Sequence, residues 1–238
     1  MKYLLAAVAA LLSTAAGAQT YIEGDAGQTL TTFADTTTLA TGTPLTTING
    51  TLTGQDADLF RIYISAPGMF LASTNNAITN NSYTGPGGGA LDTALFLFDQ
   101  AGHAIATNDD ADGLALTSTL STASPLLQSL TAGYYFLGIG ISGNEPVNSA
   151  NNLLFAMGGT TDTRGPAGNI TPTTLFDFDR NAYDAAPGAY SITLNGVSAG
   201  PAVAGPVPEP AGWALMVGGF GLLGAAMRRR RVARPLAA

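Results

Sequence analysis

The sequence predicts an all-β protein: a jelly-roll-like antiparallel β-sandwich flanked by an N-terminal signal peptide and a C-terminal transmembrane helix. Short alternating or apolar runs recur between clusters of Gly, Pro, Asn and Asp, as in sandwich strands joined by turns. No apolar repeat of helical period is found between residues 19 and 207. Both chain ends instead carry apolar segments bordered by positive charge.

The N-terminus is typical of a secretory signal peptide, residues 1–18. Met1-Lys2-Tyr3 supplies a short positive region, and Leu4 to Leu12 is apolar. Ala16-Gly17-Ala18 then provides small residues in the pattern that signal peptidase cleaves. Because this apolar run is too short to span a bilayer, we expect an exported protein that begins at Gln19.

The body, residues 19–195, is divided into short predicted strands. In Leu59–Ser65, Phe60, Ile62 and Ile64 fall on one face, which predicts a half-buried strand. Thr93–Phe98 is continuously apolar, so we expect a central strand covered on both faces. The other predicted strands are Thr46–Leu52, Met69–Ser73, Ala104–Thr107, Gly133–Ser142 and Ala189–Leu194. Long loops are predicted at 75–89 and 144–173, and a Gly/Pro/Ala/Val linker at 196–206.

The charge of the body excludes some partners. Of the 16 acidic residues in the chain, all but Glu209 lie in the body, which leaves 15. Of the nine basic residues, Lys2 and the five C-terminal arginines lie outside the body, which leaves three arginines and a net charge of −12. Nucleic acids and anionic membrane surfaces require Lys and Arg, so neither is an expected partner. The chain has no cysteine, so its stability depends on burial, hydrogen bonds or a metal ion instead of disulfides.

The residue inventory argues against catalysis. A Ser-His-Asp triad would have to use His103, the single histidine, which follows a predicted hairpin turn. A glycosidase needs two carboxylates, but Asp177 and Asp179 alternate with Phe176 and Phe178 and are expected on one solvent face. We therefore expect a protein that is not an enzyme.

Calcium is the cofactor that the acidic loops favour, because it binds six to eight oxygens from carboxylates, amides and carbonyls. One candidate group lies in a single loop and comprises Asn108, Asp109, Asp110 and Asp112. The other is Asp56 with Asp58, just before the second predicted strand. The alternative interpretation is that these are turn-forming and solvated loop residues.

The C-terminal segment, residues 207–231, begins with Val207-Pro208-Glu209-Pro210. Seventeen uncharged residues, 211–227, then form a helix of about 25 Å, near the roughly 30 Å of a bilayer core. Arg228, Arg229, Arg230 and Arg231 follow and are expected in the cytoplasm. This order closely resembles the PEP-CTERM sorting signal of Gram-negative bacteria. The resemblance implies an exosortase partner that cuts near Pro208, Glu209 and Pro210 and passes the body to the cell surface.

The body resembles bacterial pre-peptidase C-terminal (PPC-type) domains over about Glu23 to Leu194. The likeness rests on several strand-and-turn motifs, namely Gly50-Thr51-Leu52, Asp56 to Phe60, Asp92 to Asp99 with Gly102 and Asn108 to Asp110, Leu130 to Tyr135, and Gly188 to Ile192. It implies a jelly-roll-like accessory module, usually not catalytic. Calcium sites of some relatives use an acidic entry segment, which would correspond to Glu23 and Asp25 near Asp56 and Asp58.

Together these features predict an exported surface or extracellular-matrix protein with a structural, adhesive or binding role in a biofilm or exopolysaccharide setting. Extracellular polysaccharide is a candidate partner, and the membrane is a partner through residues 211–227 before processing. Two alternatives remain open. One is a periplasmic binding protein that stays anchored in the inner membrane, and the other is a secreted carbohydrate-active enzyme.

Overall fold

The computed structural model describes residues 17–74, 91–111, 116–155, 162–181 and 188–201. The chain divides into two units, Met1–Ala202 and Val203–Ala238, and every described residue belongs to the first. Most of the predicted signal peptide, the 75–89 loop, Asp112 and the whole sorting signal with its transmembrane helix lie outside the described residues. Within the described ranges, no helix has the length and apolar character needed to cross a membrane.

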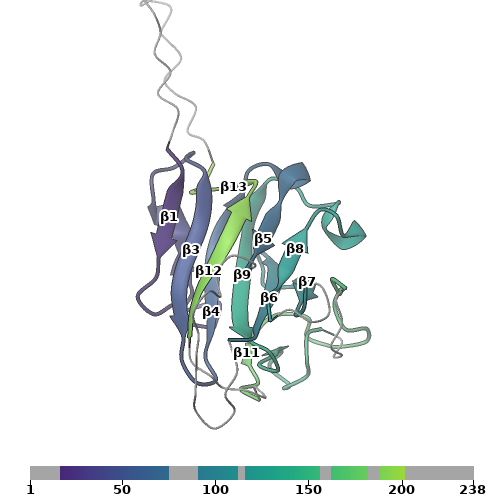
Figure 1. The fold of residues 1–238 in the computed structure, drawn as a ribbon. Coiled ribbons are helices and arrows are strands. Elements are labelled where there is room, and N and C mark those ends of the chain that lie inside the picture. Colours follow the sequence, from purple (N-terminus) through teal and green to yellow (C-terminus); the bar gives the residue numbers. More distant parts are fainter. Residues whose placement is uncertain (1–16, 75–90, 112–115, 156–161, 182–187, 202–238) are drawn as a thin grey trace, which may run out of the picture. The chain divides into compact units, whose positions relative to one another are not determined.

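The described domain is all-β, as predicted (Figure 1). One sheet has the strand order β1-β3-β12-β5-β8, and a second has the order β13-β4-β9-β6-β7, with β2 also paired to β4. The strands of the first sheet are β1 (Gln19–Ile22), β3 (Leu45–Leu52), β12 (Gly188–Asn195), β5 (Leu71–Ser73) and β8 (Thr119–Ser121). Those of the second are β2 (Ala34–Asp35), β4 (Ala57–Ile64), β6 (Thr93–Asp99), β7 (Ala104–Asn108), β9 (Gly133–Ile141) and β13 (Val197–Ser198). A separate pair joins β10 (Pro146–Val147) to β11 (Asp177–Phe178).

The sheets are mixed, so the prediction of a purely antiparallel arrangement was wrong. β1 runs parallel to β3, and β2 runs parallel to β4. Both exceptions are short strands near the N-terminus: β1 lies at the edge of the first sheet, and β2 pairs with Phe60 and Arg61 in the middle of β4. The described residues otherwise form three 3₁₀ turns, at Thr36–Thr38, Pro67–Met69 and Pro125–Leu127.

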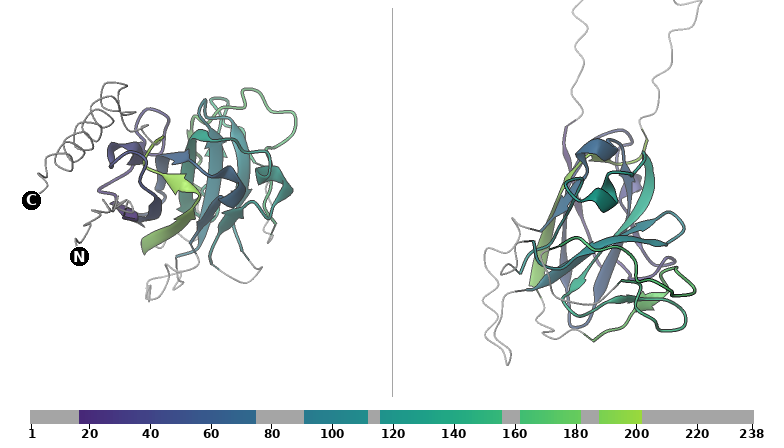
Figure 2. Two further views of the ribbon diagram at one scale, coloured as in Figure 1. Left: turned by 90° about the horizontal axis from the view of Figure 1, so that it is seen from above. Right: turned by 90° about the vertical axis from the view of Figure 1, so that its right-hand side faces the viewer.

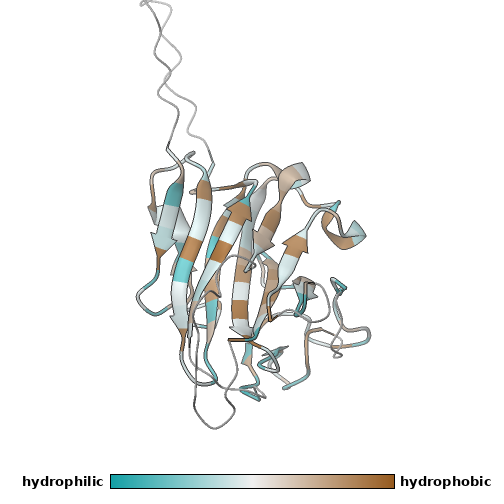
Figure 3. Cartoon of the chain, viewed as in Figure 1, coloured by the Kyte–Doolittle hydropathy of each residue, from teal (hydrophilic) through white to brown (hydrophobic). Residues whose placement is uncertain are grey.

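A hydrophobic core lies between the two sheets, because residues of both contribute to one buried cluster. In β4, Phe60, Ile62 and Ile64 are all 0% exposed, which confirms the predicted alternation. Figure 3 shows the same alternation of apolar and polar residues along β3, β12 and β9. The period of two in the sequence is therefore a direct consequence of one strand face packing on the opposite sheet.

A second hydrophobic cluster covers the other face of β4, β6 and β9. Phe96 and Phe98 of β6 pack there against Phe155, with ring centroids 5.9 and 5.8 Å apart. β6 is thus covered on both faces, as its continuous apolar run predicted. The covering residues, however, come partly from the region predicted as a loop at 144–173, which contributes β10 and buried Leu154 and Phe155.

The chain enters and leaves the domain at the same end (Figures 1 and 2). The Gln19 N–H donates to the Pro44 carbonyl over 2.8 Å, and the Ala199 N–H donates to the Thr43 carbonyl over 3.0 Å. β13 pairs with the Ile64 end of β4. The domain therefore continues past residue 195, and the predicted linker at 196–206 begins with a strand of the second sheet.

Candidate metal centre

Three carboxylates converge at the end of the domain opposite to its termini. Asp25, Asp56 and Asp58 each place one oxygen so that the three oxygens lie within 4.8 Å of one another. Asp25 follows β1, and Asp56 closes a turn in which its N–H donates to the Thr53 carbonyl. Asp58 was expected before the strand, but β4 begins at Ala57, so Asp58 lies within it. Strand alternation puts Asp58 on the inward face, together with Phe60.

Asp58 is the most deeply buried member of this cluster, with 1% of its surface exposed. Its Oδ2 accepts a hydrogen bond from the Tyr190 hydroxyl over 2.6 Å. Its Oδ1 is buried and has no hydrogen-bond partner among the described residues. Burial raises the pKa of Asp58 to about 8; the Tyr190 hydrogen bond opposes this, and the charges of Glu23 and Asp56 add to it. A buried, unpartnered carboxylate oxygen is costly, so this position requires a proton or a cation.

Glu23 completes the acidic set and is held by the backbone. Its Oε2 accepts from the Ala26 N–H over 2.8 Å, and its Oε1 accepts from the Thr51 N–H over 2.9 Å. Gly50 provides the space, because a Cβ there would lie 2.2 Å from Glu23 Oε1 and 2.4 Å from the Tyr190 hydroxyl oxygen. Glu23 and Tyr190 therefore approach the cluster only because residue 50 lacks a side chain.

Tyr190 is the part of the site that the sequence analysis missed. In β12 it faces inward with Ile192 and Leu194, and it is 3% exposed. A tyrosine on the core face of a strand needs a partner for its hydroxyl, which was the available signal. The partner, Asp58, lies 132 positions away in the sequence.

The donor set fits a hard cation. Every side chain in it offers oxygen, and calcium prefers oxygen ligands in irregular arrangements of six to eight. Zinc, by contrast, is usually held by histidine and cysteine. Asp25, Asp56 and Asp58, with Glu23 beside them, are the residues that would hold calcium here. The sequence analysis named Asp56 with Asp58 as one candidate group, and the resemblance to PPC-type domains added Glu23 and Asp25.

In the other predicted group, Asn108 has a structural role, whereas Asp109 has one buried oxygen, Oδ1, without a hydrogen-bond partner among the described residues. Asn108 Oδ1 accepts from the Thr119 N–H over 2.6 Å, and its Nδ2 donates to the Asp110 carbonyl over 3.2 Å. The Ser142 hydroxyl donates to Asp109 over 3.2 Å, and burial raises the pKa of Asp109. Among the described residues, the side chains of Asp109 and Asp110 do not join a third potential ligand in a cluster, and Asp112 lies outside those residues.

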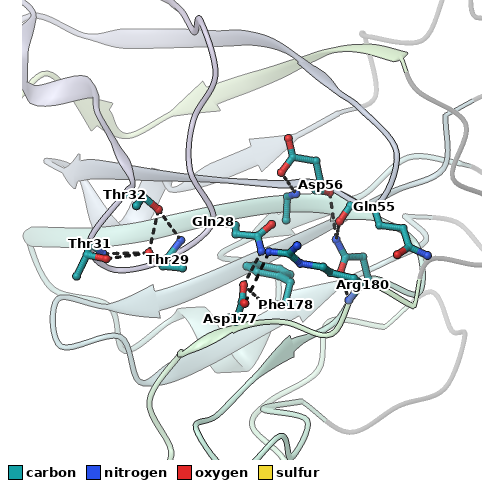
Figure 4. Close-up of polar contacts among 11 residues, drawn as sticks. Gln28, Thr29, Thr31, Thr32, Gln55, Asp56, Asp177, Phe178 and Arg180 are labelled. Atoms are coloured by element: carbon teal, nitrogen blue, oxygen red, sulfur yellow. Dashed lines mark hydrogen bonds and ion pairs between the residues drawn. The ribbon is translucent and has the colours of Figure 1, made fainter.

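A cavity of about 290 Å³ adjoins the cluster, because Asp56 belongs to both. The residues that line it are Gln28, Thr53, Gln55, Asp56 and Arg180. Figure 4 shows Gln28, Asp56 and Arg180 gathered from three separate segments. Arg180 adopts a left-handed backbone conformation, with φ of 59°, which is uncommon for a residue with a side chain.

Buried Asn144 fixes two walls of this cavity. Its Nδ2 donates to the carbonyls of Gln55 and Asp56 over 3.0 and 3.1 Å, and its Oδ1 accepts from the Arg180 N–H over 2.9 Å. Asn144 is 0% exposed. The Asn144 side chain thus holds the backbone of Gln55 and Asp56 close to the backbone of Arg180, so these two walls of the cavity are positioned by the domain itself.

Asp177 and Asp179, which were expected on one solvent face, both accept hydrogen bonds from other segments. Phe176 is 60% exposed while Phe178 is 3% exposed, so the two phenylalanines do not share a buried face, contrary to prediction. Asp177 accepts a hydrogen bond from the Gln28 amide, and Asp179 Oδ1 accepts from the Glu145 N–H over 3.0 Å. β11 is only two residues long, so strand alternation does not extend to Phe176.

His103 lies at the end of the turn after β6. Its Nδ1 lies 2.9 Å from Asp99 Oδ2, and half of its side chain is exposed. The same carboxylate accepts the N–H groups of Ala101 and His103. This is the geometry of a turn-stabilising aspartate, and it agrees with the expected turn position of His103.

Comparison of the chain with protein families, with curated proteins and with solved structures finds no match. The geometry of the acidic cluster and its cavity is therefore the basis for assigning a function to the domain.

Proposed function

We propose that the chain is an exported, non-catalytic binding protein whose β-domain holds calcium through Glu23, Asp25, Asp56 and Asp58. The observation that carries the proposal is Asp58: a carboxylate 1% exposed, with one oxygen lacking a hydrogen-bond partner among the described residues, within 4.8 Å of two further carboxylate oxygens. Without a cation, such a cluster is opposed both by desolvation and by like-charge repulsion. A divalent ion removes both costs.

For the domain as a whole we propose a jelly-roll-like sandwich of the PPC type, acting as a structural or adhesive module toward extracellular polysaccharide. Its support is the set of strand-and-turn motifs between Glu23 and Leu194, together with an all-β structure in which two sheets share one core. The C-terminal segment supports export and exosortase processing, with a final place at the cell surface or in the extracellular matrix. An inner-membrane-anchored periplasmic protein is the competing outcome.

Calcium binding is tested by thermal unfolding and by isothermal titration of the purified protein. Added calcium is expected to raise the free energy of unfolding by RT ln(1 + [Ca]/Kd), about 2.7 kcal/mol at 100 times Kd. The Asp58→Asn variant should fold but lose this gain, because a neutral amide cannot replace the carboxylate as a ligand. The Asp110→Asn variant, altered in the other predicted group, should keep the gain. An unchanged melting temperature of the unaltered protein in millimolar calcium would overturn the proposal.

A further inference from the structure

We infer that the cavity beside the acidic cluster binds a carboxylate-bearing sugar unit of an acidic polysaccharide, with the sugar carboxylate placed between the bound calcium and Arg180. The inference rests on the proposed calcium site. It adds the chemical class of the ligand and the residue that selects it.

The cluster and the cavity share a wall. Asp56 contributes one oxygen to the carboxylate cluster and also lines the cavity. Arg180 lines the same cavity as Asp56. A ligand in this space would therefore lie next to both residues.

The acidic cluster does not by itself fill the coordination shell of calcium. The ion takes six to eight oxygens. Both oxygens of Glu23 already accept backbone N–H groups, and Asp58 Oδ2 accepts the Tyr190 hydroxyl. The shell therefore needs further oxygens, and the space beside Asp56 can supply them from water or from a ligand.

Arg180 makes an anionic group the preferred donor. Of the three arginines in the body, Arg61 pairs with Asp35 and its guanidinium lies over the rings of Phe33 and Tyr134. Arg180 lies at the cavity with its side chain 59% exposed, and its ion pair with Asp177 is long, 3.8 Å from Nη2 to Oδ2. A carboxylate is the group that a guanidinium and calcium both bind well. The net charge of the body, −12, opposes a polyanion, so binding is expected only where the cation and Arg180 offset that charge locally.

The rest of the lining favours a sugar over an acidic peptide. Gln28, Gln55 and Thr53 add amide and hydroxyl groups that hydrogen-bond with sugar hydroxyls. The volume, about 290 Å³, lies at the lower end of the range for ligand pockets. It suits one sugar unit of a longer chain, with the neighbouring units outside.

The test is isothermal titration of the purified protein with oligogalacturonate, in calcium and in EDTA. Binding is expected in calcium only. The Arg180→Gln variant should lose about tenfold or more in affinity for the oligosaccharide, because a charge-assisted bond is removed, while it binds calcium as before. The matched control is Arg164→Gln, which removes an equal charge. The backbone of Arg164 pairs with that of Thr107, and Arg164 is not among the residues that line the cavity. This variant should bind both calcium and the oligosaccharide normally.

Three further results would overturn the inference. They are calcium binding without oligogalacturonate binding, equal binding of a neutral oligosaccharide of the same length, and equal binding of polyglutamate. Calcium binding without oligogalacturonate binding would leave the proposed calcium site intact. A protein that does not bind calcium at all would contradict both the proposed function and the inference. Oligogalacturonate binding in EDTA that is unaffected by Arg180→Gln would place the sugar elsewhere and also contradict the inference. The calcium-dependent melting temperature of Arg180→Gln shows whether that variant is folded.

Discussion

If the domain binds calcium as proposed, Asp58 links its stability to that ion. Asp58 lies on the core face of β4 together with Phe60, Ile62 and Ile64, and its Oδ2 accepts a hydrogen bond from the Tyr190 hydroxyl. Sequence alternation alone would place an apolar residue here. A charged residue at a core position is commonly retained for function, because burial without a partner destabilises the fold.

In EDTA, the free energy of unfolding should fall between pH 5.5 and pH 8.5. The pKa of Asp58 is raised to about 8 in the folded protein, so the folded state keeps a proton that the unfolded state has already lost at pH 5.5. Stability therefore declines as pH rises toward 8. Glu145, whose pKa burial raises to about 7, acts in the same direction. Urea unfolding at the two pH values measures the decline.

The Asp58→Asn variant separates the contribution of Asp58 to this decline from that of Glu145. It should show a smaller decline than the unaltered protein, and it should be the more stable of the two at pH 8.5 in EDTA. The carboxylates with lowered pKa values, Asp35 and Asp99, do not interfere, because they are ionised in both states throughout this range. An equal decline in both proteins would show that Asp58 is ionised in the folded state.

At the scale of elements, the segment around β10 and β11 acts as a covering layer of the second sheet. Phe155 is 2% exposed and packs on Phe96 and Phe98. The Phe155→Ala variant should lose about 3–5 kcal/mol of unfolding free energy, since a buried ring is replaced by a cavity. Phe176→Ala is the matched control, because Phe176 is 60% exposed, and it should change stability by about 0.5 kcal/mol or less.

Chemical denaturation of both variants measures these changes. Similar, small losses would mean that Phe155 lies on the surface and that the outer layer does not form. The comparison therefore tests an element that the sequence analysis described only as a loop.

The strands were predictable because their signal is local. Phe60, Ile62 and Ile64 show a period of two within a single strand, and Thr93–Phe98 is apolar throughout. The outer layer was not, since Leu154 and Phe155 belong to one short apolar run, 153–157, whose sequence does not reveal which face of a sheet it covers. Likewise, Asp56 and Asp58 could be proposed as ligands from their spacing. The roles of Tyr190 and Asn144 depend on contacts between residues far apart in the chain, which no local pattern contains.

For the whole molecule, the prediction concerns processing. In a host with an exosortase, the intact mass of the surface fraction should lack residues 1–18 and everything after about residue 210. This follows from the resemblance of residues 207–231 to a sorting signal. A variant with Arg228 to Arg231 changed to glutamine should remain unprocessed. A mass that keeps the arginines, found only in the inner membrane, would instead establish a permanent anchor.

The placement of the chain ends has a mechanical consequence. β13 leaves the domain beside Ile64, whereas the acidic cluster lies at the Asp58 end of the same strand, about 20 Å away at the usual rise per residue. A pull between a glycan held at the cluster and an attachment beyond residue 201 would run along β4. The short ladder from β13 to β4, which pairs Val197 with Ile64 and Ser198 with Tyr63, would then join the two points of attachment and carry the load between them.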